Sequence, residues 1–182
     1  RSGCVSLSIG LESINRASLD SVNKSFNLPQ HFPRDLAAIR GKGIQVIALL
    51  MVGLDGDSVD TFRRSLEFLI DNKVSFLKLF TPCPYPGTKY YDDMAQAGRI
   101  LTHDWGRYDY GSPLIKPAHL TPDEMMEGFT YVYRGFYSTR AIVKRLFPPP
   151  TGSYLETLAY LVANLKVNRY LRKNENAWAT IS

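Results

Sequence analysis

The chain has 182 residues, a formal net charge of +5, and 45% hydrophobic against 21% charged residues. This length is enough for one well-buried core, and the composition is typical of a soluble globular protein. No apolar run approaches the roughly 20 residues that a membrane-spanning helix needs, and the sequence has no secretory signal. Two cysteines, Cys4 and Cys83, are too few for a disulfide framework or a zinc site and favour a reducing, cytoplasmic compartment.

Short apolar runs alternate with helical patterns along the first half of the chain. The apolar runs predict buried strands at Val5–Ile9, Ile44–Val52 and Val74–Phe80. Strands separated by helices are joined by right-handed crossovers, so we predict a parallel sheet with Cys4 and Cys83 at opposite ends and no disulfide between them. The helical patterns lie at Leu19–Ser25, Phe32–Lys42, Val59–Asn72 (with Ser58 or Asp57 as N-cap) and Gly87–Gly98.

The pattern changes after Gly98. Residues 99–120 have no clear periodicity and predict a long ordered loop or lid. Its tyrosines are expected mostly in the core, although a minority could line a substrate pocket. Thr121-Pro-Asp-Glu124 is a capping box with proline in the first turn, and it predicts a helix to about Tyr137. A break near Ser138 and a second helical segment to Phe147 are expected to follow, and Pro148–Pro150 ends that segment.

The last expected helix runs from Tyr154 to about Lys173 and is amphipathic. It places Leu155, Leu158, Leu161, Val162 and Leu165 on one stripe. We therefore divide the chain into residues 1–98, an α/β unit, residues 99–147, a lid and helical extension, and residues 148–182, the last helix.

Basic residues concentrate in the second half of the chain. Helix-spaced basic side chains are more often a solvated face than a nucleic-acid surface, so nucleic-acid binding is not expected. An RNA-binding appendage is the weaker alternative. The basic residues are Arg134, Arg140, Lys144, Arg145, Lys166, Arg169, Arg172 and Lys173.

Ligands of parallel α/β folds bind at the carboxyl ends of the strands, so the residues just past each expected strand are the candidate site. These are Gly10–Ser13, Gly53–Asp57 and Thr81–Gly87. Glu12 can accept hydrogen bonds from a ribose hydroxyl or an ammonium group, although an N-cap or a surface salt bridge also fits it. A glycine such as Gly53 at a strand end permits close approach by a ligand.

Two other chemistries are weighed and not favoured. Asp55 and Asp57 flank a glycine, but the further ligands of a calcium loop are missing and Asp57 is well placed to cap a helix, so no metal site is predicted. Cys83 lies between Pro82 and Pro84 with no histidine nearby in sequence, which favours a small apolar wall residue over a nucleophile.

Several stretches together resemble the radical SAM enzymes, in particular the branch that carries an N-terminal cobalamin-binding domain. The resemblance covers roughly residues 3–147, and the order and spacing of the motifs are more specific than any one of them. The tail that resembles the branch begins at "DWGRYDYGSPLIKPAHL", and the motifs before it are "VSLSIGLES", "LDSVNK", "GIQVIALLMVGLDGDSVDTF" and "FLKLFTPCPYPGTKYYDDMAQAGRI".

The resemblance implies a fold, cofactors and residue roles. The fold would be a partial (β/α)6 barrel, of which this α/β chain forms half, with three parallel strands and a C-terminal helical extension. The cofactors would be a 4Fe-4S iron-sulfur cluster, S-adenosylmethionine (SAM) and, in that branch, cobalamin. SAM would contact Glu12, Ser13, Lys24, Gly53, Pro82, Cys83 and Pro84.

The sequence departs from the family in one respect, because it lacks the three-cysteine motif that holds the cluster. The chain also begins at Arg1 without an initiator Met, so we expect an excised piece of a radical SAM oxidoreductase or methyltransferase that is inactive and binds no cofactor alone. Its substrate, a small molecule or a lipid, is not predicted. The alternative is a self-contained nucleotide- or partner-binding module without catalysis.

A half barrel would expose a strand edge and an inner sheet face. Strand side chains alternate, so Ile9, Leu49, Met51, Leu77 and Leu79 cannot all face the outer helices. The partner expected for these surfaces is the missing N-terminal part of the same protein. In the isolated chain we expect self-association instead, although helices after Gly98 could also fold back over the open face.

Overall fold

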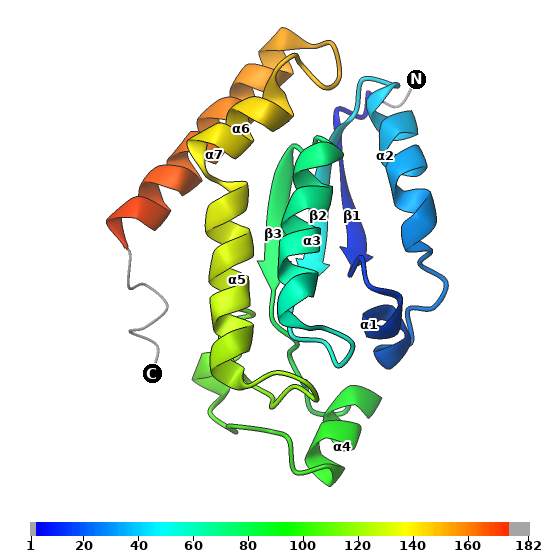
Figure 1. Ribbon diagram of the computed structural model, residues 1–182, viewed down its shortest axis with the longest axis vertical. Coiled ribbons are helices and arrows are strands. Elements are labelled where there is room, and N and C mark those ends of the chain that lie inside the picture. Colours follow the sequence, from blue (N-terminus) through cyan, green and yellow to red (C-terminus); the bar gives the residue numbers. More distant parts are fainter. Residues whose placement is uncertain (1–2, 175–182) are drawn as a thin grey trace.

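In the computed structural model, which describes residues 3–174, the sheet has three parallel strands in the order β1-β2-β3 (Figure 1). The strands are β1 (Ser6–Glu12), β2 (Gln45–Met51) and β3 (Phe76–Phe80). Both pairs are parallel, which confirms the predicted topology, and Cys4 and Cys83 are free. The carboxyl ends of the strands point to the lower side of Figure 1, toward α1 and α4.

The helices match the predicted pattern, with ends that differ by a few residues. The first helix starts earlier than expected, and the predicted break near Ser138 separates α5 from α6. The helices are α1 (Arg16–Ser21), α2 (Phe32–Arg40), α3 (Val59–Asp71), α4 (Lys89–Gln96), α5 (Pro122–Phe136), α6 (Thr139–Leu146) and α7 (Tyr154–Lys173), with 3-10 turns at Pro29–His31 and Trp105–Arg107. None of these helices is long and apolar enough to cross a membrane.

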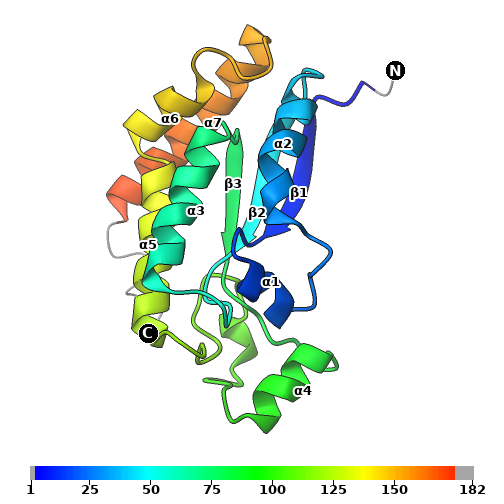
Figure 2. The ribbon, with the colours of Figure 1, turned by 45° about the vertical axis from the view of Figure 1, so that its right-hand side comes forward.

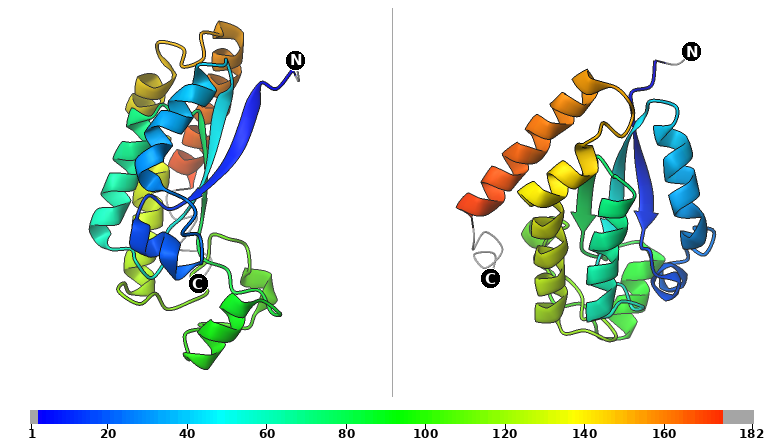
Figure 3. Two further views of the ribbon diagram at one scale, coloured as in Figure 1. Left: turned by 90° about the vertical axis from the view of Figure 1, so that its right-hand side faces the viewer. Right: turned by 45° about the horizontal axis from the view of Figure 1, so that its top comes forward.

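The helices α2, α3 and α5 all cover the same face of the sheet (Figures 1 and 2). Seen edge-on in Figure 3 (left), the opposite face carries no helix of the described residues. The core lies in the covered layer, where Leu77 packs with Phe62, Phe129 and other apolar residues. Leu49 and Met51 remain only half-buried on the open face, as the alternation of strand side chains predicts, whereas Ile9 is half-buried against the covered core. One face of the sheet is therefore packed against helices, and the other face is open.

The two edges of the sheet are treated differently. At the edge of β3, the Tyr137 hydroxyl donates to the Leu77 carbonyl at 2.8 Å and accepts from the Leu77 amide at 3.2 Å. Asn164 of α7 donates to the Ser75 carbonyl at 3.0 Å. These side chains thus hydrogen-bond to backbone groups with which another strand would have to pair. In residues 3–174 no strand pairs with the other side of β1.

Arg145 of α6 is the buried cation of this fold, with 0% of its surface exposed. The sequence pattern groups it with solvated basic residues, and the structure corrects this placement. Its guanidinium donates to the carbonyls of Val74 at 2.6 Å and Phe136 at 2.9 Å, and to the Asn164 side chain at 3.0 Å. It also stacks 3.5 Å from the centre of the Phe136 ring. Burial lowers its pKa to about 9, so the group is still a cation near neutral pH.

We expect Arg145→Leu to destabilise the fold by about 3 kcal/mol, because buried carbonyls of β3 and α5 lose their donor. Urea unfolding followed by circular dichroism measures the change. Arg140→Leu is the matched control, since Arg140 lies on the same helix and is exposed. An unfolding midpoint equal for both variants would contradict the role of Arg145.

Candidate functional site

The loops after β1 and β3 meet at the carboxyl edge of the sheet, as the sequence predicts. A cavity of about 430 Å³ on the open face is lined by Glu12, Leu49, Met51, Phe80, Thr81, Cys83, Tyr85 and Tyr110. A second cavity of about 210 Å³ shares Met51 and Cys83 with it and extends past Pro82 toward α1 and α4. Glu12, Pro82 and Cys83 therefore line one continuous region, and Pro84 is buried beside it.

Glu12 has a left-handed backbone conformation, which is unfavourable for a residue with a side chain. Its φ is 62°, and the register between β1 and β2 shifts between Gly10 and Glu12. The side chain folds back over Gly10, where a Cβ would lie 2.9 Å from the Glu12 carboxylate. Strained residues of this kind collect at functional sites, where the surrounding structure holds them in place.

Two residues of the predicted site form a loose ion pair. The Lys24 ammonium lies 3.6 Å from the Glu12 carboxylate, and both side chains are partly exposed. The Lys24 ammonium also lies 5.6 Å from the centre of the Phe26 ring. Ser13, in contrast, is buried, and its hydroxyl accepts the Asn15 amide hydrogen at 3.0 Å at the start of α1. It thus shapes the turn in which Glu12 lies.

Asp57 closes the loop after β2 instead of capping a helix. Its carboxylate accepts the amide hydrogens of Gly53 at 2.9 Å and Leu54 at 3.2 Å, and the Ser18 hydroxyl donates to it at 2.5 Å. The N-cap of α3 is Ser58, so the expected capping role of Asp57 is wrong. Burial, which is the main cause, raises the pKa of Asp57. This carboxylate ties α1 to the loop.

Asp55 is also engaged within the protein. It forms an ion pair with Arg99 and accepts the Ala118 amide hydrogen at 3.1 Å. The hydrogen bond from Arg99 is the main reason that the pKa of Asp55 is lowered. The described residues contain no group of three side chains placed to bind a metal ion. The pair of aspartates therefore organises the loops around the site.

Contacts within the protein itself require glycine at position 53. Its φ is 92°, and a Cβ at this position would overlap the Met125 sulfur atom of α5. Met125 is fully buried. The close approach that the sequence indicates at this strand end is thus made by a helix of the same chain, and contact between Gly53 and a ligand stays a prediction.

Cys83 forms part of the cavity wall between Pro82 and Pro84. The two prolines are buried and Cys83 is half-buried. Burial, the largest cause, raises the pKa of the Cys83 thiol. A raised pKa disfavours the thiolate that a nucleophile needs, which is consistent with the interpretation of Cys83 as a wall residue.

An aromatic cluster beside the cavity was anticipated from the sequence only in part, as a few tyrosines that could line a pocket. The ring of Tyr110 lies 6.0 Å from that of Tyr85 and 5.6 Å from that of Phe80. Tyr108 extends the cluster, with its ring 6.1 Å from Tyr85 and 4.9 Å from Trp105. Tyr85, Tyr110 and Trp105 are all exposed, although the lid tyrosines were expected mostly in the core. The available signal was the concentration of aromatic residues on both the proline loop and the aperiodic segment.

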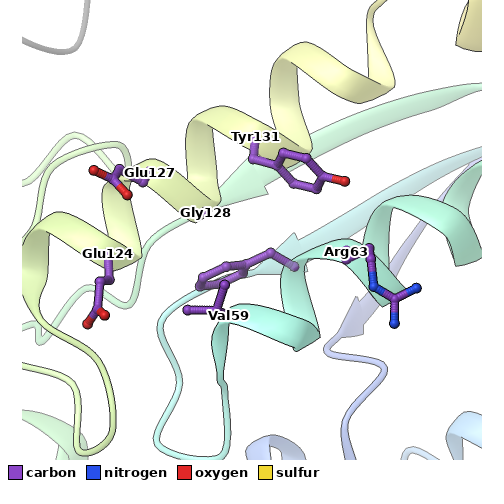
Figure 4. A pocket seen from close by; sticks show the side chains of 7 residues that line it. Val59, Arg63, Glu124, Glu127, Gly128 and Tyr131 are labelled. Atoms are coloured by element: carbon purple, nitrogen blue, oxygen red, sulfur yellow. The ribbon is translucent and has the colours of Figure 1, made fainter.

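A further cavity of about 430 Å³ lies in the helical layer between α3 and α5 (Figure 4). Glu124, Glu127 and Tyr131 come from α5, and Val59 and Arg63 from α3. Gly128 faces Phe62 there, and a Cβ on Gly128 would overlap the ring. This cavity shares no lining residue with the cavities at the carboxyl edge. It is formed where the closely packed helices α3 and α5 meet.

The fold and the cavities at its carboxyl edge define an α/β protein with a candidate ligand cleft at the ends of parallel strands. No family model matches the chain. It is 31% identical over 173 residues to the bacteriochlorophyllide d C-12(1)-methyltransferase of Chlorobaculum tepidum, covering 95% of this chain and 36% of that protein. It is 25% identical over 142 residues to the anaerobic magnesium-protoporphyrin IX monomethyl ester cyclase of Cereibacter sphaeroides, covering 78% of this chain and 23% of that protein.

A third relative is the hopanoid C-2 methylase of Rhodopseudomonas palustris, 24% identical over 96 residues, or 53% of this chain and 18% of that protein. The relatives are thus methyltransferases and a cyclase, all of them enzymes. The chain spans about a third of the length of the first relative and about a quarter or less of the other two.

We expect Gly53→Ala to lower the free energy of unfolding by about 3 kcal/mol, because the new methyl group displaces Met125 and φ is positive. Gly43→Ala is the matched control: Gly43 has a φ of 78° and nothing within 4 Å of its Cβ position, so only about 1 kcal/mol is lost. Urea unfolding of both variants measures the difference. Equal losses would show that Met125 yields without cost.

Proposed function

We propose that the chain is the carboxyl-terminal half of a (β/α)6 barrel in a radical SAM enzyme, a methyltransferase or an oxidoreductase. The 31% identity to a methyltransferase over 95% of the chain carries the proposal. The open edge of β1 and the bare sheet face are consistent with it. The same similarity to enzymes argues against a binding module without catalysis.

In this proposal the chain supplies one side of the SAM site. The amino-acid end of SAM carries one ammonium and one carboxylate, and it can insert between Glu12 and Lys24, whose charged groups lie 3.6 Å apart. Glu12 then exchanges the Lys24 ammonium for the ammonium of SAM, and Lys24 exchanges the Glu12 carboxylate for the carboxylate of SAM. No charge is left unpaired. Pro82–Pro84 form a rigid wall for the nucleoside, because prolines lose little freedom on binding.

In this proposal the residues of this chain bind and orient SAM and the substrate. Its only cysteines are Cys4 and Cys83, so the cysteines that hold the iron-sulfur cluster belong to another part of the protein. A cluster held there would supply the electron that cleaves SAM, and cobalamin, where the branch uses it, would be bound outside this sequence. The residues of this chain position SAM and substrate against those groups.

The substrate we propose is a large, flat and mainly apolar small molecule. The relatives are named for bacteriochlorophyllide d, magnesium-protoporphyrin IX monomethyl ester and hopanoids. In this chain the exposed rings of Tyr85 and Tyr110 line the larger of the two carboxyl-edge cavities, together with Leu49 and Met51. Aromatic rings and thioethers are well suited to stack on a flat apolar molecule.

We expect Glu12→Ala and Lys24→Ala, each in the intact protein, to weaken SAM binding roughly tenfold or more, because each removes a charge-assisted contact. The absorbance of the cluster should not change. Calorimetry measures the affinity, and Arg63→Ala on α3 is the control, since Arg63 pairs with Asp60 and Glu67 and lines neither cavity of this edge. Tight SAM binding by the isolated chain would contradict an anchor outside this sequence.

We also propose that the isolated chain self-associates through β1. Val5 and Leu7 are exposed beside an edge that no other strand of residues 3–174 covers. Leu7→Lys should shift the chain toward monomer, because a charge at a strand edge opposes pairing. Sedimentation velocity measures the distribution, with Val59→Lys on α3 as the control. A wild-type chain that stays monomeric at high concentration would refute the proposal.

A further inference from the structure

The inner face of α7 carries both polar and apolar side chains: Leu171 is buried in the core, and Val167 packs against the core. Thr157 and Asn164 are buried on its inner face. Asn164 bonds to the Ser75 carbonyl and to Arg145, and Asn168 donates to the Tyr137 carbonyl at 2.6 Å. Polar side chains therefore share with Leu171 the anchoring of this helix, whereas a surface helix usually turns its whole apolar stripe inward.

The apolar stripe of α7 faces outward instead. Its members are spaced three or four residues apart and so lie on one side of the helix. Figure 1 and Figure 3 (right) both show α7 at the outer margin of the molecule, with no other element of the described residues beyond it. The exposed fractions are 79% for Leu155, 54% for Leu158, 46% for Val162 and 42% for Leu165. A continuous exposed stripe of this kind marks an interaction surface.

The stripe continues into positive charge toward the end of the helix. Arg169 and Arg172 follow at the same spacing, with Lys166 and Lys173 beside them. Within residues 3–174 none of these four makes an ion pair. Tyr154 and Tyr170, at the two ends of the helix, are 76% and 58% exposed. The outer face is thus apolar and basic, with aromatic residues at its ends.

This distribution does not suit pairing with a second α7. An antiparallel pair centred on Val162 would set Arg169 of one helix against Leu155 of the other, and Lys166 against Leu158. A parallel pair would place like charges against each other. Both arrangements bury unpaired charge, which is costly.

We propose that α7 is an interfacial helix that binds the surface of an anionic lipid membrane. Its leucines insert between the lipid chains, the four basic side chains reach the phosphate groups, and the two tyrosines lie at the boundary. Lys and Arg reach toward phosphates while their stems cover apolar surface, and anionic lipids supply the charge that the helix lacks. The surface lies apart from the ligand cleft, so the proposal does not depend on the proposed enzyme activity.

The test is co-sedimentation of the 182-residue chain with vesicles of phosphatidylcholine alone and of phosphatidylcholine mixed equally with phosphatidylglycerol. We expect binding to the mixed vesicles that weakens with salt and is much weaker without phosphatidylglycerol. Arg169→Glu and Arg172→Glu should each lower the affinity about fivefold or more. The double variant Leu155→Gln/Leu158→Gln should lower it roughly tenfold or more.

The controls change the same chemistry elsewhere. Lys116→Glu and Val59→Gln alter an exposed charge and an exposed apolar residue away from α7, and both should bind as the wild type does. On the wild-type chain, hydrogen exchange should slow in residues 154–173 when mixed vesicles are added, which tests the surface without any variant.

Five results would overturn the proposal, and four of them concern vesicle or RNA binding and hydrogen exchange. These are no binding to mixed vesicles, equal binding by the α7 variants and the controls, unchanged exchange in α7, and retention of RNA with no binding to vesicles. Self-association that the α7 leucine variants abolish, but Leu7→Lys does not, would also overturn it, because a second copy would then cover the stripe.

Discussion

A single buried guanidinium holds the carboxyl-terminal helices against the sheet. Arg145 has no carboxylate partner among its hydrogen bonds, and it is held by the carbonyls of Val74 and Phe136 and by Asn164. Phe136 ends α5, where helix carbonyls carry partial negative charge, so backbone dipoles supply the compensation that a carboxylate would give. The arrangement fixes α5, α6 and α7 relative to the start of β3.

The position of α5 connects this anchor to the candidate cleft at the carboxyl edge of the sheet. Near its other end, α5 places Met125 against Gly53, and Gly53 lies in the loop that Asp57 closes. The same helix carries the Phe129 and Val132 side chains of the core. The shape of the cleft thus depends on a helix that is itself fixed at the opposite end of the sheet. Substitutions far from the cleft can therefore change it.

The local features of this fold could be predicted from the sequence. The strands follow from apolar runs, and the start of α5 from the Thr121 capping box, because both signals lie within a few neighbouring residues. The convergence of Glu12 and Cys83 followed from one topological rule about parallel sheets. The burial of Arg145, the partner of Gly53 and the aromatic cluster around Tyr85 depend on contacts between distant segments. Neither periodicity nor spacing contains that information.

The edge of β3 is blocked by a side chain, so the sheet can be extended only at its other edge. Tyr137 occupies both the amide and the carbonyl of Leu77, so a strand arriving at that edge would have to displace a buried side chain. Any strand that joins the sheet must therefore join at β1. Glu12 lies at the end of β1 and is then the residue of the cleft nearest to the added strand. The width of the cleft, and with it the size of molecule that fits, is set by whatever pairs with β1.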